Sequence, residues 1–124
     1  MLEELSNVSI LKSTIRRFPG IIISGLHRQI GKTTAILELI HEDHRGQAWY
    51  FCQNEQARRH AILLYRQMYG FETFYSATMV EMLGGSLDWP VYVDEWESIP
   101  TITREKLICN RIRNPIFCRI GSSL

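Results

Sequence analysis

The sequence predicts an α/β protein with a parallel sheet that helices cover on both faces. Short apolar runs alternate with amphipathic helical segments along the chain, which is the pattern of strands connected by crossover helices. The 124 residues are 45% hydrophobic, and this length is close to the common size of one domain. We therefore expect a single domain over residues 1–124, with an N-terminal helix over 1–18 and a core over 20–124.

Residue spacing predicts each element in turn. Apolar runs predict strands over 20–24, 48–52, 90–95 and 116–120, and a short edge strand over 71–75. Helical periodicity predicts helices over 2–17, 32–44 and 54–69, and from 100 to about 113. Asn54 is a typical helix N-cap. Thr78 and Glu81 have the form of a capping box that opens a short helix, which the pair Gly84 and Gly85 ends.

Residues 26–34, Leu-His-Arg-Gln-Ile-Gly-Lys-Thr-Thr, follow the first apolar run and open the second helix. A strand that turns tightly into a helix directs backbone N–H groups and the positive helix end at one point, where an anion binds. Lys32 can contact the β- and γ-phosphates of a nucleotide, and the Thr33 hydroxyl can bind Mg²⁺. The usual pattern has a glycine where this chain has Leu26, so an ordinary helix start is the alternative interpretation.

Two carboxylates, Asp94 and Glu95, end the apolar run over 90–95. This is the Walker B form. An acidic residue at the carboxyl end of a strand beside a phosphate loop can hold Mg²⁺ and its water shell, and a second can orient the attacking water. We expect Asp94 to take the first role and Glu95 the second. A solvated turn is the alternative.

These residues resemble the ATPase domain of the large terminase subunits, which package DNA into tailed-phage heads. That family replaces the first loop glycine and carries Arg-Gln, an aliphatic residue and Gly-Lys-Thr-Thr, as residues 28–34 do. An aliphatic residue and proline follow its Walker B strand, as Ile99 and Pro100 do here. Its next strand ends in small hydroxyl residues, as at Ser122 and Ser123. The resemblance implies an ASCE-type P-loop NTPase fold with a minimal core of four to five strands.

The resemblance also implies Mg²⁺-dependent ATP binding and hydrolysis, coupled to the packaging or translocation of double-stranded DNA in an assembly. The residues expected to bind ATP are Gln29, Ile30, Gly31, Lys32, Thr33 and Thr34. Those expected to hold Mg²⁺ are Thr33 and Asp94. Those expected to act in catalysis are Glu95, Arg28 and Lys32.

Two of these roles have ordinary alternatives. Arg28 matches a loop arginine that neutralises charge on the γ-phosphate in the transition state, and a surface ion pair is its alternative. Ser122 and Ser123 match the segment that couples phosphate loss to DNA movement. The alternative interpretation is that they belong to a frayed chain end. Trp96 departs from the family, which has a small residue there. It either fills a gap or contacts a partner.

The resemblance predicts a strand order as well. The strand over 116–120 should lie between the first strand and the strand over 90–95, with the strand over 48–52 outside the latter. The family's further strand beside the first is absent from these residues, so we expect the N-terminal helix, a second protomer or a larger partner to cover that open edge. No residues remain for a nuclease domain, and nuclease activity is not expected.

Two other functions stay open. One is a catalytically weak nucleotide-binding or interaction module that regulates a phage DNA-processing machine. The other is a small helicase-like ATPase, which ranks lower because of the Arg-Gln pair in the loop. A net charge of +1 argues modestly against autonomous DNA binding. The basic residues Arg104, Lys106, Arg111 and Arg113 are a candidate DNA contact, with a solvated helix face as the alternative.

The remaining features predict a cytoplasmic protein, in the host cytoplasm if phage-encoded. No membrane-spanning run and no secretory signal are seen. Three cysteines without metal-site spacing are expected to be reduced. His41 and His44 close a helix, where histidines interact favourably with the helix dipole, and are not expected to bind a metal.

Overall fold

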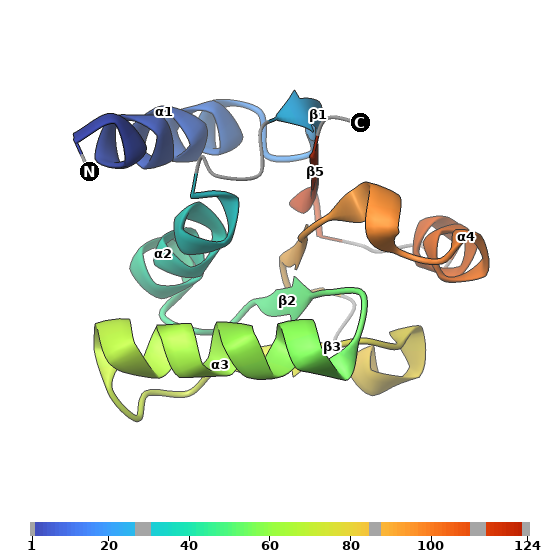
Figure 1. Cartoon of the computed structure of the whole chain (residues 1–124). Helices are drawn as coiled ribbons and strands as arrows, with labels where there is room; N and C mark the ends of the chain where they lie inside the picture. Colours follow the sequence, from blue (N-terminus) through green and yellow to red (C-terminus); the bar gives the residue numbers. More distant parts are fainter. Residues whose placement is uncertain (1, 27–30, 85–87, 110–113, 123–124) are drawn as a thin grey trace.

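A five-stranded, all-parallel sheet forms the centre of the structure (Figure 1). The structure is a computed structural model that describes residues 2–26, 31–84, 88–109 and 114–122. The strand order is β1-β5-β4-β2-β3. The strand bounds are β1 Ile22–Leu26, β2 Trp49–Phe51, β3 Tyr75–Ala77, β4 Val91–Val93 and β5 Phe117–Ser122. The α/β class is confirmed, and so is the expected order in which β5 lies between β1 and β4.

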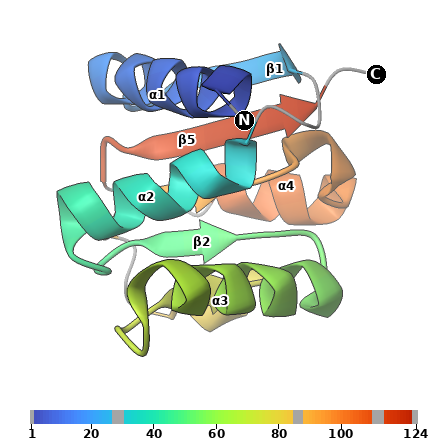
Figure 2. The ribbon, with the colours of Figure 1, turned by 60° about the vertical axis from the view of Figure 1, so that its left-hand side comes forward.

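Helices cover both faces of the sheet. One face carries α1 (Leu2–Arg17), α2 (Lys32–His44) and α3 (Glu55–Tyr69), which Figure 2 shows in front of the strands. The opposite face carries α4 (Thr101–Cys109) and two 3₁₀ turns, η1 (Val80–Leu83) and η2 (Trp96–Ser98). Each layer encloses its own apolar cluster, centred on Ile36 and Tyr65 on the first face and on Phe51 and Leu107 on the second.

Helix α1 is joined to α2 by apolar packing and ion pairs. Leu11 and Ile15 are buried in the cluster that α2 shares. Lys12 Nζ lies 3.1 Å from Glu38 Oε1 and 2.7 Å from Glu42 Oε2. Arg16 also pairs with Glu42, at 2.9 Å. These partners are partly exposed, so the ion pairs orient α1 more than they stabilise it, and burial of its apolar stripe supplies the stability.

Several element boundaries differ from those predicted. The first strand begins at Ile22 because the Ile21 N–H donates to the Phe18 carbonyl, at 3.1 Å, and forms a turn there. The edge strand predicted over 71–75 is found at Tyr75–Ala77, since the preceding residues connect the end of α3 to the sheet edge. Helix α4 is described as far as Cys109, and the remainder of the helix predicted to about 113 lies outside the described residues.

The predicted helix caps have opposite outcomes. The Asn54 side chain accepts a hydrogen bond from the Ala57 N–H at 2.8 Å, so the N-cap of α3 is confirmed. The capping box at Thr78 is wrong, because η1 is a 3₁₀ turn whose N-cap is Met79, without a side-chain cap. The Thr78 N–H and hydroxyl instead lie 3.5 and 3.7 Å from Met82 Sδ. No helix in the described part of the chain is both long and apolar enough to cross a bilayer.

Candidate functional site

The start of α2 and the two residues after β4 meet at the carboxyl edge of the sheet. Lys32, the first residue of α2, has a side chain that is only 2% exposed. Its Nζ lies 2.9 Å from Glu95 Oε1, and the Glu95 side chain is 26% exposed. A buried ammonium needs an anionic partner. Glu95, which also faces solvent, is such a partner.

Thr33 and Asp94 form a second contact beside the first. Thr33 Oγ1 donates to Asp94 Oδ2 at 2.5 Å. The Tyr50 hydroxyl of β2 donates to the same carboxylate oxygen at 2.6 Å. The Asp94 carboxylate is therefore held from two sides, by the helix that follows β1 and by the strand that neighbours β4.

The second oxygen of Asp94 has no hydrogen-bond donor among the residues that the structure describes. Asp94 is 3% exposed, and its Oδ1 is buried without a partner among the described residues. Burial raises the pKa of Asp94, although hydrogen bonds from Thr33 and Tyr50 act in the opposite direction. A buried carboxylate oxygen without a donor is costly, and a cation beside it would remove that cost.

The donor set at Asp94 fits Mg²⁺. This ion prefers oxygen ligands and is usually bound by one or two carboxylates together with waters and substrate phosphates. A hydroxyl, Thr33 Oγ1, lies next to the carboxylate and is a second oxygen of the required kind. The described residues include no group of three His, Cys, Asp or Glu side chains that could hold a metal. A metal here would therefore need ligands from a bound nucleotide or from water.

The backbone on both sides of the site has left-handed conformations. Gly31 precedes α2 with φ 76° and ψ 32°, and no side chain caps the helix. Glu95 has φ 52° and ψ 55°, an uncommon conformation for a residue with a side chain. Such strain collects at functional sites, where the fold compensates for it. The first turn of α2 contains no acidic residue, so its positive end remains available for an anion.

The structure describes only part of the predicted site. It brings together Gly31, Lys32, Thr33, Asp94 and Glu95, and Thr34 follows in the first turn of α2. Ser122 ends β5, the strand between β1 and β4. The other predicted site residues, Arg28, Gln29, Ile30 and Ser123, lie outside the described residues.

Tyr50 is a site residue that sequence reasoning missed. In the sequence it lies in the apolar run Ala-Trp-Tyr-Phe-Cys and reads as one core residue of a buried strand. Its hydroxyl is the available signal, because a buried tyrosine O–H requires a hydrogen-bond partner. The partner is identified only by the pairing of β2 with β4, which places Tyr50 beside Tyr92, two residues before Asp94.

Trp96 fills space on the α4 face of the sheet. Its ring packs edge-to-face against Phe117, with centroids 6.1 Å apart. The guanidinium carbons of Arg119 and Arg104 lie 5.5 and 6.0 Å from its centroid. Of the basic residues predicted as a DNA contact, Arg104 thus lies over Trp96, and Lys106 pairs with Glu81 at 3.3 Å. The other two, Arg111 and Arg113, lie outside the described residues.

His41 and His44 contact tyrosine rings. His44 Nε2 is 2.8 Å from the Tyr92 hydroxyl, and the His41 ring stacks on Tyr69 with centroids 3.6 Å apart. All three cysteines are free thiols, with Cys52 and Cys118 buried and Cys109 exposed.

The sequence matches no protein-family model, and no curated protein or solved structure is significantly similar to the chain.

Proposed function

We propose that the chain binds Mg²⁺–ATP at the carboxyl edge of the sheet and hydrolyses it. Asp94 is the observation that carries this proposal. Its carboxylate is buried, has one oxygen without a donor, and lies 2.5 Å from the hydroxyl of the second residue of α2. A carboxylate and a hydroxyl in contact at a helix N-terminus are suited to a cation that accompanies a bound anion.

Each residue at the site has a role in this proposal. Gly31 allows the left-handed turn that precedes α2, and the N–H groups of the first turn point to the phosphates. Lys32 contacts the β- and γ-phosphates, and Thr33 and Asp94 hold Mg²⁺. When bound, Mg²⁺ neutralises charge that develops on the phosphate oxygens.

The Lys32–Glu95 ion pair connects binding to catalysis. In the absence of a nucleotide, the two side chains neutralise each other at 2.9 Å. A triphosphate competes for the same ammonium, so binding frees the Glu95 carboxylate to orient a water molecule and accept its proton.

The resemblance extends the proposal to further residues, most of which lie outside the described ranges. Arg28 would stabilise charge on the γ-phosphate, Gln29 and Ile30 would line the loop with Thr34, and Ser122 and Ser123 would couple hydrolysis to movement. We also propose that the ATPase works on double-stranded DNA in a terminase-like packaging assembly of a phage, in the host cytoplasm.

The test is steady-state ATP hydrolysis with Lys32→Ala as the blank, at several protein concentrations, with and without double-stranded DNA. We expect turnover above the blank that depends on Mg²⁺. Glu95→Gln should keep ATP binding and lose hydrolysis by a hundredfold or more, on the order expected for a lost general base. Glu105→Gln is the matched control, because Glu105 is an exposed glutamate on α4.

Equal rates for wild type and Lys32→Ala would overturn the catalytic roles. If the wild type still binds Mg²⁺–ATP in that case, the chain is a nucleotide-binding module. Stimulation by double-stranded DNA supports a packaging motor. Stimulation by single-stranded DNA alone favours the helicase-like alternative.

A further inference from the structure

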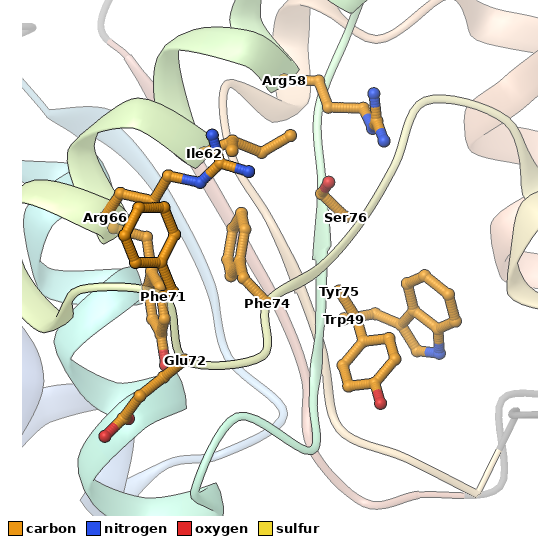
Figure 3. Close-up of a pocket in the computed structure, with 10 residues that line it drawn as sticks. Trp49, Arg58, Ile62, Arg66, Phe71, Glu72, Phe74, Tyr75 and Ser76 are labelled. Carbon is orange, nitrogen blue, oxygen red and sulfur yellow. The ribbon is translucent and has the colours of Figure 1, made fainter.

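A cavity lies at the opposite edge of the sheet from β1. It has a volume of about 360 Å³ and is formed by one side of α3, the α3–β3 connection, β3 and Trp49 (Figure 3). The strand order places β3 at the edge of the sheet, with two strands, β4 and β2, between it and β5. None of the residues of the candidate ATP site lines this cavity.

Two arginines of α3 line the cavity, and one of them, Arg66, has no carboxylate partner among the described residues. Arg58 Nη1 donates to Glu55 at 2.5 Å, but its Nε–H is buried and has no acceptor among the described residues. Arg66 forms no ion pair with any carboxylate in the described part of the chain, and its guanidinium carbon lies 5.7 Å from the Phe71 ring centroid. The one lining carboxylate, Glu72, lies 3.1 Å from His41 Nδ1. The cavity therefore has donors in excess of acceptors.

Aromatic rings form much of the remaining wall. Phe74 is stacked on Tyr65, with centroids 4.7 Å apart, and Trp49 packs edge-to-face on Tyr75 at 5.8 Å. Phe71 differs from these rings because it is 93% exposed. Figure 3 shows Arg66 beside Phe71 on one side of the cavity and Arg58 on another. An exposed phenylalanine contributes almost nothing to folding, but an exposed ring beside a guanidinium is suited to stacking with a planar ligand.

We propose that this cavity binds a nucleotide unit, an aromatic base joined to a phosphate, either as a free nucleotide or as one unit of a single strand. The base stacks on Phe71, and the guanidinium group of Arg66 binds the phosphate. Proteins that bind single strands combine these two features, aromatic platforms and a positively charged groove. An acidic peptide would use the guanidinium group but would leave the Phe71 ring without a stacking partner.

The test is fluorescence anisotropy of a fluorescein-labelled oligothymidylate of about ten nucleotides, a length within the range that one small binding module covers. Arg66→Ala and Phe71→Ala are each expected to weaken binding about tenfold. Arg59→Ala is the matched control. Arg59 lies on the same helix, carries the same charge, is 77% exposed and does not line the cavity. Circular dichroism of each variant checks that the fold is retained.

Thymidine monophosphate as a competitor distinguishes the two sources of the ligand. If thymidine monophosphate displaces the oligonucleotide at a concentration similar to that of the oligonucleotide's own nucleotide units, the cavity is a free-nucleotide site. If it displaces none, the ligand is a single strand. Both results support the proposal when Phe71→Ala weakens oligonucleotide binding. Lys32→Ala should leave oligonucleotide binding unchanged, because Lys32 belongs to the other site.

Three results would overturn the proposal. One is that the wild type at low salt binds neither the oligonucleotide nor, in a calorimetric titration, thymidine monophosphate. Another is equal weakening by Arg59→Ala and Arg66→Ala, which would indicate attraction by overall charge alone. The third is that an oligoglutamate peptide binds as tightly as the oligonucleotide and its binding is weakened equally by Arg66→Ala. The ligand would then be an acidic peptide. Loss of ATP hydrolysis in any variant bears only on the ATPase proposal.

Discussion

The Glu97 carboxylate lies directly against Gly121, at the carboxyl end of β5. A Cβ at Gly121 would overlap Glu97 Oε2 and lie 3.3 Å from Glu97 Cδ. Because Glu97 is two residues beyond Glu95 in the chain, this contact joins the turn that carries one site residue to the end of the strand that carries Ser122. Gly121 thus leaves room for the carboxylate of another side chain, the flexible end of Glu97.

Gly121→Ala is expected to lower the free energy of unfolding by up to about 1 kcal/mol, because the new methyl group displaces the Glu97 carboxylate, the end of a flexible side chain. Urea denaturation at neutral pH measures it. Gly20→Ala is the control, because a Cβ there meets the Pro115 carbonyl oxygen at an acceptable 3.4 Å. In a Glu97→Ala background the cost of Gly121→Ala should shrink. An unchanged cost would show that the overlap with Glu97 is not its cause.

Asp94→Asn is expected to stabilise the nucleotide-free protein by about 1 kcal/mol at pH 7. Burial raises the pKa of Asp94 in the folded state, so an ionised carboxylate there is unfavourable to folding above its unfolded pKa. The difference between Asp94→Asn and wild type should decrease as the pH falls through the raised folded pKa. The same variant should lose Mg²⁺-dependent ATP binding, which calorimetric titration can measure. A variant that is destabilised at pH 7 would contradict the argument.

His44 is expected to make the protein less stable as the pH falls below about 6.5, the ordinary pKa of histidine. Burial lowers the pKa of folded His44, so the unfolded chain takes up a proton first. Stability is lost between the unfolded pKa and the lower folded pKa, by at most about 1.4 kcal/mol per pH unit. Urea denaturation between pH 7.5 and about 5 compares the wild type with His44→Gln. Equal slopes for the two proteins would rule out His44 as the cause.

The free edge of β1 predicts self-association. Among the described strands β1 pairs only with β5, and Ile22 on β1 is 53% exposed. An open edge with exposed apolar side chains recruits another chain, and a charged residue there opposes pairing. We expect a mass above that of the monomer in light scattering at micromolar concentration, and a lower mass for Ile22→Lys. Ile102→Lys is the control, since Ile102 is 65% exposed on α4. A monomeric wild type would contradict the prediction.

Much of the fold was predictable because local signals and the global fold agree. The alternation of apolar runs and helical periods indicated the α/β class, and Asn54 marked the start of α3. The limits of short elements were less predictable. In η1, the sequence of a capping box is present at Thr78 and Glu81, but only four residues lie between Met79 and Gly84, and they form a 3₁₀ turn.

Within the site, the sequence by itself determined which residue types are present: a Gly-Lys-Thr-Thr segment after one strand and an Asp-Glu pair after another. Only the tertiary structure decided how they meet. Parallel pairing through β5 and β2 places Thr33 beside Asp94, adds Tyr50 to the same carboxylate, and leaves one oxygen of Asp94 without a donor. The physical reason is that hydrogen bonding and burial depend on residues distant in the chain, and the order of the strands in the sheet determines which of them become neighbours.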